Sequence, residues 1–329
     1  MDRLPLALLV WGCCLSFVYA QGPTPLPLLS GSVLPPPSTR GEEETGLLVD
    51  ASLFAWALRS SQRDFAFKAA STPAGVVGQV RSLEGGYDPG FRIAVGYSFE
   101  ADRELRLGFT RWNHGAHAVE RANGEERLFP TLTHPALIIE ADSVRAASNL
   151  NLNVLDLELA RRYGLGEGIQ TRIFFGPRWA QLDQKLTATH EGGDVAVDVV
   201  RRRVKFDGGG LRLGGDADVA LLDHLGMFVR GSAGVVAGRF RSSLEESVNG
   251  FPLLNLSDRL PRTVPMADLG FGVTYQRGGM RLSVGYEFTN WFGVMEGLEF
   301  SEDSYPAKPG RRLGDLGFDG VFFRAELQF

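Results

Sequence analysis

Cysteine is nearly absent from the chain, because only Cys13 and Cys14 occur and both lie in an apolar stretch near the N-terminus. This stretch, with Arg3 before it and Ala20 at its end, is typical of a secretory signal peptide, and we expect cleavage after Ala20. The mature chain then has no cysteine, which excludes a disulfide framework and a cysteine metal site. An alternative, a lipoprotein acylated at Cys13, requires the bulky Trp11 near the cleavage point.

Long apolar runs are also missing. After residue 20 no segment has the roughly 18 consecutive apolar residues of a membrane-spanning helix. The net charge of −5 is small for 329 residues, so it predicts no polyanionic partner and no nucleic acid. Lysine is scarce beside arginine, a bias to which we attach no function.

Three regions follow from composition: a signal peptide at residues 1–20, a Pro-rich disordered lead-in at 21–45, and a folded domain at 46–329. In the folded domain apolar residues recur with a period of two, which indicates strands. Ten segments show the pattern, the last being residues 320–329. The first of them, residues 47–56, also fits a helical stripe, and we interpret it as a strand because a closed sheet needs an even number.

Short and long connections alternate along the chain. The short ones lie near Glu100, Gly164, Leu221 and Arg277, and the long ones cover residues 58–90, 113–151, 183–203, 242–264 and 294–315. Compact domains seldom contain five such long loops, whereas an outer-membrane barrel has short periplasmic turns and long extracellular loops. The prediction is therefore a closed antiparallel transmembrane β-barrel of about ten strands. Twelve remain possible if the apolar residues near Ala136 belong to a further hairpin.

The chain ends in alternating apolar residues, including Phe323, Leu327 and Phe329. In lipid every backbone polar group needs a partner, so we expect the last strand to pair with the first. The terminal Phe resembles the signal read by the bacterial barrel-assembly machinery. A C-terminal strand of a soluble sandwich is the alternative.

Three segments, at residues 153–163, 174–184 and 284–291, together with the C-terminal A-E-L-Q-F, resemble the Legionella-type major outer-membrane protein family. The resemblance extends over roughly residues 46–329. It implies a pore-forming outer-membrane barrel and supplies no catalytic residues. The Pro-rich lead-in lies outside it.

The polar residues that alternate with the apolar ones predict a polar lumen of mixed charge, since charged side chains would be energetically costly on the lipid face. The predicted lumen residues are Asp50, Arg92, Arg106, Asp156, Glu158, Arg172, Arg178, Arg212, Asp216, Asp218, Arg230, Asp268, Arg281, Glu287, Arg324 and Glu326. The alternative is a charge network that fills the barrel, because small barrels are packed with side chains, and the inward Phe174 and Phe228 would narrow it further.

Aromatic residues near strand ends predict interfacial girdles, with core aromatics as the alternative. They are Tyr97, Phe99, Trp112, Tyr163, Trp179, Tyr275, Tyr286, Trp291 and Phe292.

The remaining motifs favour structural interpretations. His114 and His117 are expected in a solvated loop, as is His134, and we find no matching carboxylate pattern for His190 or His224. Asp216 and Asp218 are interpreted as inward strand residues, not as a calcium site. The residues around Ser232 do not have the spacing of a nucleophile elbow, and the glycines near Gly208 are interpreted as allowing strand bending and close packing. The basic residues 201–203 are expected at a rim or loop tip, solvated or in contact with lipopolysaccharide phosphate.

We therefore expect a narrow pore for small solutes or ions, or a structural envelope component, without enzymatic activity, metal or cofactor. The expected partners are outer-membrane lipid and lipopolysaccharide, the barrel-assembly machinery and small solutes, with the oligomeric state open. The alternative is a surface adhesion or recognition protein that uses long loops on a plugged barrel. A rim hydrolase and a soluble secreted sandwich are two further alternatives.

Overall fold

The computed structural model describes residues 45–60, 64–72, 75–100, 102–133, 140–166, 168–300 and 309–329. No helix among them is long and apolar enough to cross a membrane. Ten of the described strands form an antiparallel ring: β1 (Gly46–Ser60), β4 (Tyr87–Glu100), β5 (Arg103–Arg121), β7 (Ser143–Gly164), β8 (Ile169–Gly192), β9 (Val195–Ala220), β10 (Leu225–Val248), β11 (Phe251–Arg277), β12 (Met280–Phe300) and β13 (Pro309–Gln328). The expected signal peptide and nearly all of the lead-in fall outside the described residues.

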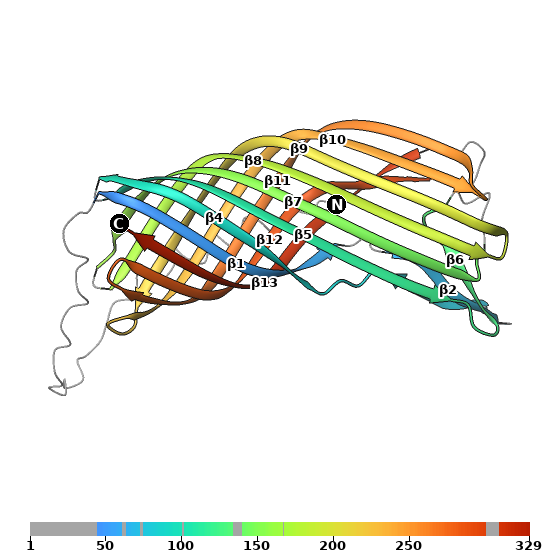
Figure 1. The fold of residues 1–329 in the computed structure, drawn as a ribbon, viewed down its shortest axis with the longest axis horizontal. Helices are drawn as coiled ribbons and strands as arrows, with labels where there is room; N and C mark the ends of the chain where they lie inside the picture. The colour runs from blue at the N-terminus through green and yellow to red at the C-terminus, as the bar shows by residue number, and fades with distance from the viewer. Residues whose placement is uncertain are drawn as a thin grey trace, which may run out of the picture. The chain divides into compact units, whose positions relative to one another are not determined.

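The ring closes through β1, which pairs with β13 on one side and with β4 on the other (Figure 1). The register with β13 runs from Leu48 opposite Gln328 to Ser60 opposite Leu316. Ten strands, the antiparallel ring and the pairing of last strand with first are therefore confirmed. The ambiguous first segment is strand β1 and not a helix.

Four short turns join the ring strands at the end where β1 begins and β13 ends, which we call the turn end. They connect β4 to β5, β7 to β8, β9 to β10 and β11 to β12, where the sequence predicted them. The prediction of long loops at the opposite end was wrong for two connections. There β8 and β9 continue as paired strands to a two-residue turn, and so do β10 and β11. In these segments polar outward residues still alternate with inward residues, many of them apolar, and this two-residue period is that of a strand.

The ring strands are consequently 14 to 27 residues long. Two of the other predicted loops contain a separate three-stranded sheet made of β2 (Asp64–Thr72), β3 (Gly75–Ser82) and β6 (Glu126–Pro130). Figure 1 shows β2 and β6 at the end opposite the C-terminus. Most of the apolar segment near Ala136, and His134, lie outside the described residues.

Outward and inward faces differ as the alternation predicts. Outward side chains near the turn end are apolar and open to the surroundings, for example Leu53, which is 68% exposed, together with Ile93, Leu211 and Phe271. Their neighbours in sequence point into the ring. In such a ring each strand forms its backbone hydrogen bonds with its neighbours, and the apolar outer band can contact lipid, as a membrane-spanning structure requires.

The interior changes character along the barrel. Beyond the middle, the inward positions become large and apolar, and they form one buried cluster that includes Trp56, Trp112, Phe206, Phe240 and Phe318. Trp56 packs against both Trp112 and Phe318, with ring centroids 5.8 Å apart in each pair. The half of the barrel away from the turn end is therefore packed with side chains.

The end of β12 and the start of β13 leave the ring. Pairing of β11 with β12 stops at Met266 opposite Trp291, while β12 continues in pairing with β13 alone. A bulge occurs at this point, and Gly293 has φ 62°, a conformation that favours glycine. Residues 294–298 are buried at every position, on both faces of the strand, and not at alternate ones.

We call residues 294–300 of β12 with 309–314 of β13 the inserted hairpin. Val294, Met295 and Leu298 join the apolar cluster of the barrel interior, and Gly297 lies directly against the inward side chain of Arg202 in β9. Since β9 lies three strands away from β12 in the ring, the hairpin bends inward and lies over the inner face of β9. It thus adds to the packing that fills this half.

Candidate functional site: the barrel interior

A cavity of about 1500 Å³ lies in the half of the barrel nearest the turn end. All sixteen predicted lumen residues line it. Its lining also includes Gly166, Asp223 and Gly278 from three short turns, so the cavity reaches the turn end of the barrel. At its other limit lie Trp56, Leu152 and Trp291, which belong to the apolar cluster. The cavity is therefore open at one end and bounded by packed side chains at the other.

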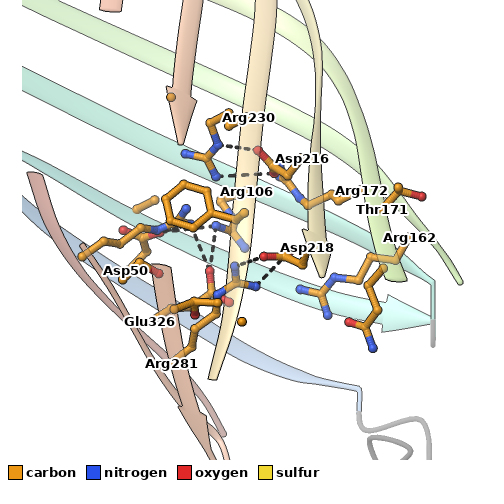
Figure 2. Close-up of a pocket in the computed structure, with 18 of the residues that line it drawn as sticks. Asp50, Arg106, Arg162, Thr171, Arg172, Asp216, Asp218, Arg230, Arg281 and Glu326 are labelled. Carbon is orange, nitrogen blue, oxygen red and sulfur yellow. Dashed lines mark hydrogen bonds and ion pairs between the residues drawn. The ribbon is translucent and has the colours of Figure 1, made fainter. Parts of the chain in front are cut away.

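Arginine and carboxylate side chains pair across the cavity in three groups. In the first, a nitrogen of Arg106 lies 3.4 Å from an Asp50 oxygen and 3.2 Å from a Glu326 oxygen. Arg324 donates hydrogen bonds to the same two carboxylates. Figure 2 shows the three labelled members, Asp50, Arg106 and Glu326, together. This group ties β1, β5 and β13 to one another, next to the strand pair that closes the ring.

The second group is centred on Arg172 of β8. Its guanidinium donates to Glu158 at 2.7 Å, to Asp216 at 3.0 Å and to Glu104. Arg230 also donates to Asp216, and Figure 2 shows both arginines directed at that carboxylate. A guanidinium carries five N–H donors, so one arginine can satisfy several carboxylates from different strands.

The third group lies nearest the apolar cluster. Arg178 holds Asp156 with two hydrogen bonds of 2.6 and 2.8 Å, and Arg212 donates to Glu158 at 2.7 Å. The ring of Phe174 lies 4.9 Å from both the Arg172 and Arg212 guanidinium carbons, so two cations share one aromatic ring.

The absence of a side chain at Gly214 makes room for the Phe174 ring. A Cβ there would lie 2.5 Å from Cζ of Phe174, so only glycine allows the ring to fill the wall. The predicted inward Phe228 also lines the cavity, where its ring packs 6.0 Å from that of Phe322.

The remaining predicted lumen residues make simpler contacts. Arg92 lies 3.4 Å from Glu287, and Arg281 donates to Asp218, a pair that Figure 2 also shows. Asp268 accepts a hydrogen bond of 2.7 Å from Ser232, which therefore serves the network and lies in mid-strand.

Two members of the network were missed in the sequence. Glu104 is almost completely buried and contacts Arg106, Arg172 and Arg162, and Arg162 lines the cavity beside it. Both residues occupy inward-facing positions of their strands, so the two-residue alternation that identified Arg106 and Glu158 also predicts that they line the interior.

Two of the nine predicted girdle aromatics are not interfacial. Trp112 and Trp291 are 0% and 1% exposed. They point inward because they lie an even number of residues from the inward-facing residues of their strands, and not from the lipid-facing ones. Tyr97, Phe99, Tyr163, Trp179, Tyr275 and Phe292 are exposed on the outer face, and Tyr286 is half-buried.

The histidine predictions also need correction. His114 and His117 lie in strand β5 and not in a loop; His114 is buried, with Nδ1 2.7 Å from Asp88, and His117 is exposed. His190 has a carboxylate partner that the sequence analysis missed: its Nδ1 lies 2.8 Å from Asp198, and the two residues are directly opposite across the β8–β9 turn. A hairpin with its turn at Gly193 and Asp194, together with the one-residue bulge beside Gly192, places the two residues opposite each other.

The basic residues 201–203 belong to β9, not to a loop tip, and Arg202 points inward. Among the described residues no group of three or more His, Cys, Asp or Glu side chains is arranged to hold a metal ion.

An antiparallel ring with an apolar outer band and a charged interior defines an outer-membrane β-barrel. The family model described as "Legionella pneumophila major outer membrane protein precursor" matches residues 42–329, so this chain belongs to that family, as the resemblance indicated, and its location is the outer membrane. The turn end is therefore periplasmic and the opposite end extracellular. No curated protein matches the chain.

Solved structures of outer-membrane barrels resemble this one. The outer membrane protease OmpT from Escherichia coli has a TM-score of 0.51 and 8% identity, over 88% of this chain and 100% of that one. A major outer membrane protein from Thermus thermophilus has a TM-score of 0.32 and 13% identity, over 84% of this chain and 99% of that one. At these identities the OmpT likeness shows the fold alone.

Proposed function

We propose that this outer-membrane protein is a narrow pore for small solutes or ions, and that the structure represents its closed conformation. The observation that supports the proposal is the cavity of about 1500 Å³, which lies inside the membrane ring and is open toward the periplasm. A barrel that served only as a wall would not need to keep so large a polar space. Side chains alone fill barrels of about eight strands, only slightly smaller than this ring of ten.

Charge in the cavity is nearly balanced. Nine arginines and ten carboxylates line it, and arginines pair with carboxylates of other strands. Such groups replace part of the hydration shell of a passing solute. Because neither sign dominates, we expect weak preference between cations and anions, measured as a reversal potential close to zero in a salt gradient across a planar bilayer.

The inserted hairpin is the part of the extracellular half that can move without breaking the ring. Its two strands pair only with each other, and above Trp291 no backbone ladder joins it to β11. An ion pair of 2.6 Å between Arg311 and Asp258 connects it to that neighbour. We propose that the pathway opens when this hairpin leaves the barrel interior.

Shortening the hairpin tests the pore directly. Residues 293–314 are replaced by Asn-Gly, which restores a two-residue turn between Phe292 and Asp315. We expect conductance steps and liposome swelling that are larger than for the unmodified protein. The matched control shortens the β10–β11 tip, which is not inserted, and should leave conductance unchanged. If the shortened protein folds, as shown by heat-modifiable migration, yet neither conducts nor swells liposomes, the pore proposal is wrong.

The alternative function is surface recognition on a plugged barrel. It is favoured by the part of the apolar cluster that belongs to ring strands, Trp56, Trp112 and Phe318, which cannot leave with the hairpin. Replacing residues 122–142, the connection between β5 and β7, by Asn-Gly distinguishes the two functions. Under the pore proposal this replacement preserves conductance, whereas under the recognition alternative it abolishes binding to a surface.

We further propose that the protein has no hydrolytic activity. The His190–Asp198 pair resembles part of a catalytic triad, but both side chains are completely buried, so a substrate cannot reach them. A His190→Ala variant should leave lipid and peptide hydrolysis at the background level of the unmodified protein.

Assembly is proposed to use the C-terminal strand. Phe323, Leu327 and Phe329 all lie on the outer face, where Phe329 is 69% exposed, and this arrangement would leave them accessible to the barrel-assembly machinery before the ring closes. Removing Phe329 should reduce the amount of protein in the outer membrane without changing the conductance of the protein that does assemble. The control is Leu53→Ala, which alters another outward residue.

A further inference from the structure

The extracellular part of the barrel carries a basic surface on its outer face. On the adjacent strands β8 to β11, seven basic residues point outward in a set that we call the basic surface: Lys185, Arg201, Arg203, Lys205, Arg239, Arg241 and Arg259. Figure 1 shows these four strands side by side. Three carboxylates, Asp183, Asp207 and Glu245, face outward among them, so the surface has an excess of positive charge. The net charge of the whole chain conceals this, because acidic residues elsewhere compensate for it.

Three members of the basic surface lie in one row across the sheet. Lys205 is directly opposite Arg241, and Arg241 is directly opposite Arg259. Residues opposite each other on one face have Cβ atoms about 5 Å apart, and like charges at that separation destabilise a sheet. Among the described residues none of the three forms an ion pair, so the protein itself does not neutralise the row.

The nearby carboxylates are engaged elsewhere. Asp183 accepts two hydrogen bonds, of 3.0 and 2.7 Å, from Arg203. Asp207 accepts one of 3.0 Å from the indole of Trp179 and is directly opposite Arg239, and Glu245 is directly opposite Arg201. The row of three cations is therefore the part of the surface that lacks an internal counter-charge.

The basic surface begins where the apolar outer band ends. On β8 the outward residues from Ile173 to Trp179 are apolar, and on β10 they are apolar up to Ala237, two residues before Arg239. Trp179 is an exposed aromatic residue at this boundary, the position that interfacial girdles occupy. The cations consequently lie at the level of the lipid headgroups of the outer leaflet.

The other side of the barrel differs at the same level. On β7 the outward residues Asn149, Asn151 and Asn153 are uncharged, and on β1 the outward Arg59 is neutralised by Asp319 at 2.6 Å. On β5 the outward Arg111, opposite Asn153, is a single cation, so the positive charge is concentrated on β8 to β11 and is weaker elsewhere around the rim.

We propose that the basic surface binds the phosphate groups of lipopolysaccharide, with the row of Lys205, Arg241 and Arg259 as its centre. Arginine and lysine form charge-assisted hydrogen bonds with phosphate oxygens, and arginine does so in a bidentate manner. The adjoining apolar band receives the acyl chains of the same lipid molecule. Both parts of an anionic lipid therefore find a complementary surface. This proposal depends on the outer-membrane location and not on the pore.

The test compares binding of phosphorylated and dephosphorylated lipopolysaccharide to the full protein in neutral detergent, by fluorescence of labelled lipid. The triple variant Lys205→Gln, Arg241→Gln, Arg259→Gln removes the row. We expect the unmodified protein to prefer the phosphorylated lipid and the variant to bind it at least about tenfold more weakly, since each cation near an anionic lipid surface contributes several-fold. Binding of the dephosphorylated lipid should be the same for both proteins.

The matched control removes three outward charges elsewhere, with Arg121→Gln, Arg145→Gln and Arg277→Gln, and should retain the preference. Heat-modifiable migration shows that each variant is folded, and bilayer conductance, which should not change, separates this test from that of the pore. Equal binding of the two lipids by the unmodified protein overturns the proposal. Full retention of the preference in the triple variant, or equally strong binding of inorganic pyrophosphate, overturns it as well.

Discussion

The periplasmic and extracellular halves of the barrel share the same strands but contain different interiors. The periplasmic half holds a cavity lined by paired arginines and carboxylates, such as Arg172 with Asp216. The extracellular half is filled by aromatic and aliphatic side chains around Trp112, with the inserted hairpin packed among them. The difference shows that the outward face is constrained by the membrane, whereas the inward face is free to be a polar space or an apolar core.

Closure of the proposed pathway thus depends on packing and not on charge. A charged constriction would be screened by salt and would still admit water, whereas a packed apolar core excludes both ions and water. The two halves should consequently respond differently to substitution, to pH and to salt.

The largest effect is expected in the apolar half. Trp112→Ala removes a fully buried indole that packs against Trp56, Phe318 and His114, and it should lower the free energy of unfolding by about 3–5 kcal/mol. Urea unfolding in lipid vesicles measures this change. Phe271→Ala, which removes an outward aromatic residue, serves as the control and should have a smaller effect. Equal losses for both variants would show that the extracellular half is not a packed core.

A somewhat smaller loss is expected in the polar half. Arg172→Met leaves the carboxylates of Glu104, Glu158 and Asp216 without their shared cation, and breaking a buried ion pair in this way typically costs about 3–5 kcal/mol. Because water can enter the cavity, we expect a loss of about 3 kcal/mol in the same urea experiment. Arg92→Met, which breaks a single ion pair, with Glu287, is the matched control and should cost less. An unfolding free energy that does not change would mean that the network is already solvated.

The sequence predicted the ring well because one physical rule governs it. Residues such as Ile93 and Arg92 must alternate if a wall separates lipid from a polar interior, and the position of each follows from the phase alone. The same rule places Glu104 and Arg162 inward, although they were overlooked. It also placed the closing pair of strands, since an open edge cannot exist in lipid.

The extracellular half could not be predicted in the same way. Outside the membrane, alternation does not reveal whether an inward side chain faces water or another side chain, so Trp112 and Trp291 could be read as girdle residues. The inserted hairpin breaks the rule altogether, because residues 294–298 are buried on both faces by contact with β9, a strand distant in sequence. Only three-dimensional structure shows such a contact.

A pH effect is expected where the hairpin meets the barrel wall. Glu296, which lies beyond the last outward apolar residue of β12, is buried, and burial raises the pKa of its carboxyl to about 7. The Ser60 hydroxyl, Arg312 and Arg202 lower this pKa, and Asp315 raises it. Because the folded pKa lies above the usual 4.5, the closed hairpin is most stable below about pH 4.5 and loses stability as pH rises through 7.

We therefore expect the open fraction in planar bilayers to increase between pH 5 and pH 8, with a change on the order of 2 kcal/mol after allowance for partial exposure. Glu296→Gln should remain closed and lose the pH dependence. Glu299→Gln, on the same hairpin, is the control and should keep it. An open fraction of the unmodified protein that is constant over this range would contradict the role assigned to Glu296.

The smallest effect is expected from the ion pair that joins the hairpin to β11. Arg311 donates two hydrogen bonds to Asp258, of 2.6 and 3.1 Å, and holds the pKa of that carboxyl below its usual range, but both groups are accessible to water and screened by salt. Arg311→Gln should change the ratio of open to closed pores by less than about fivefold, and the change should vanish at high salt. Asp258→Asn should do the same, and the double variant should add nothing further. A much larger change would mean that an electrostatic latch, not the apolar core, keeps the extracellular half closed.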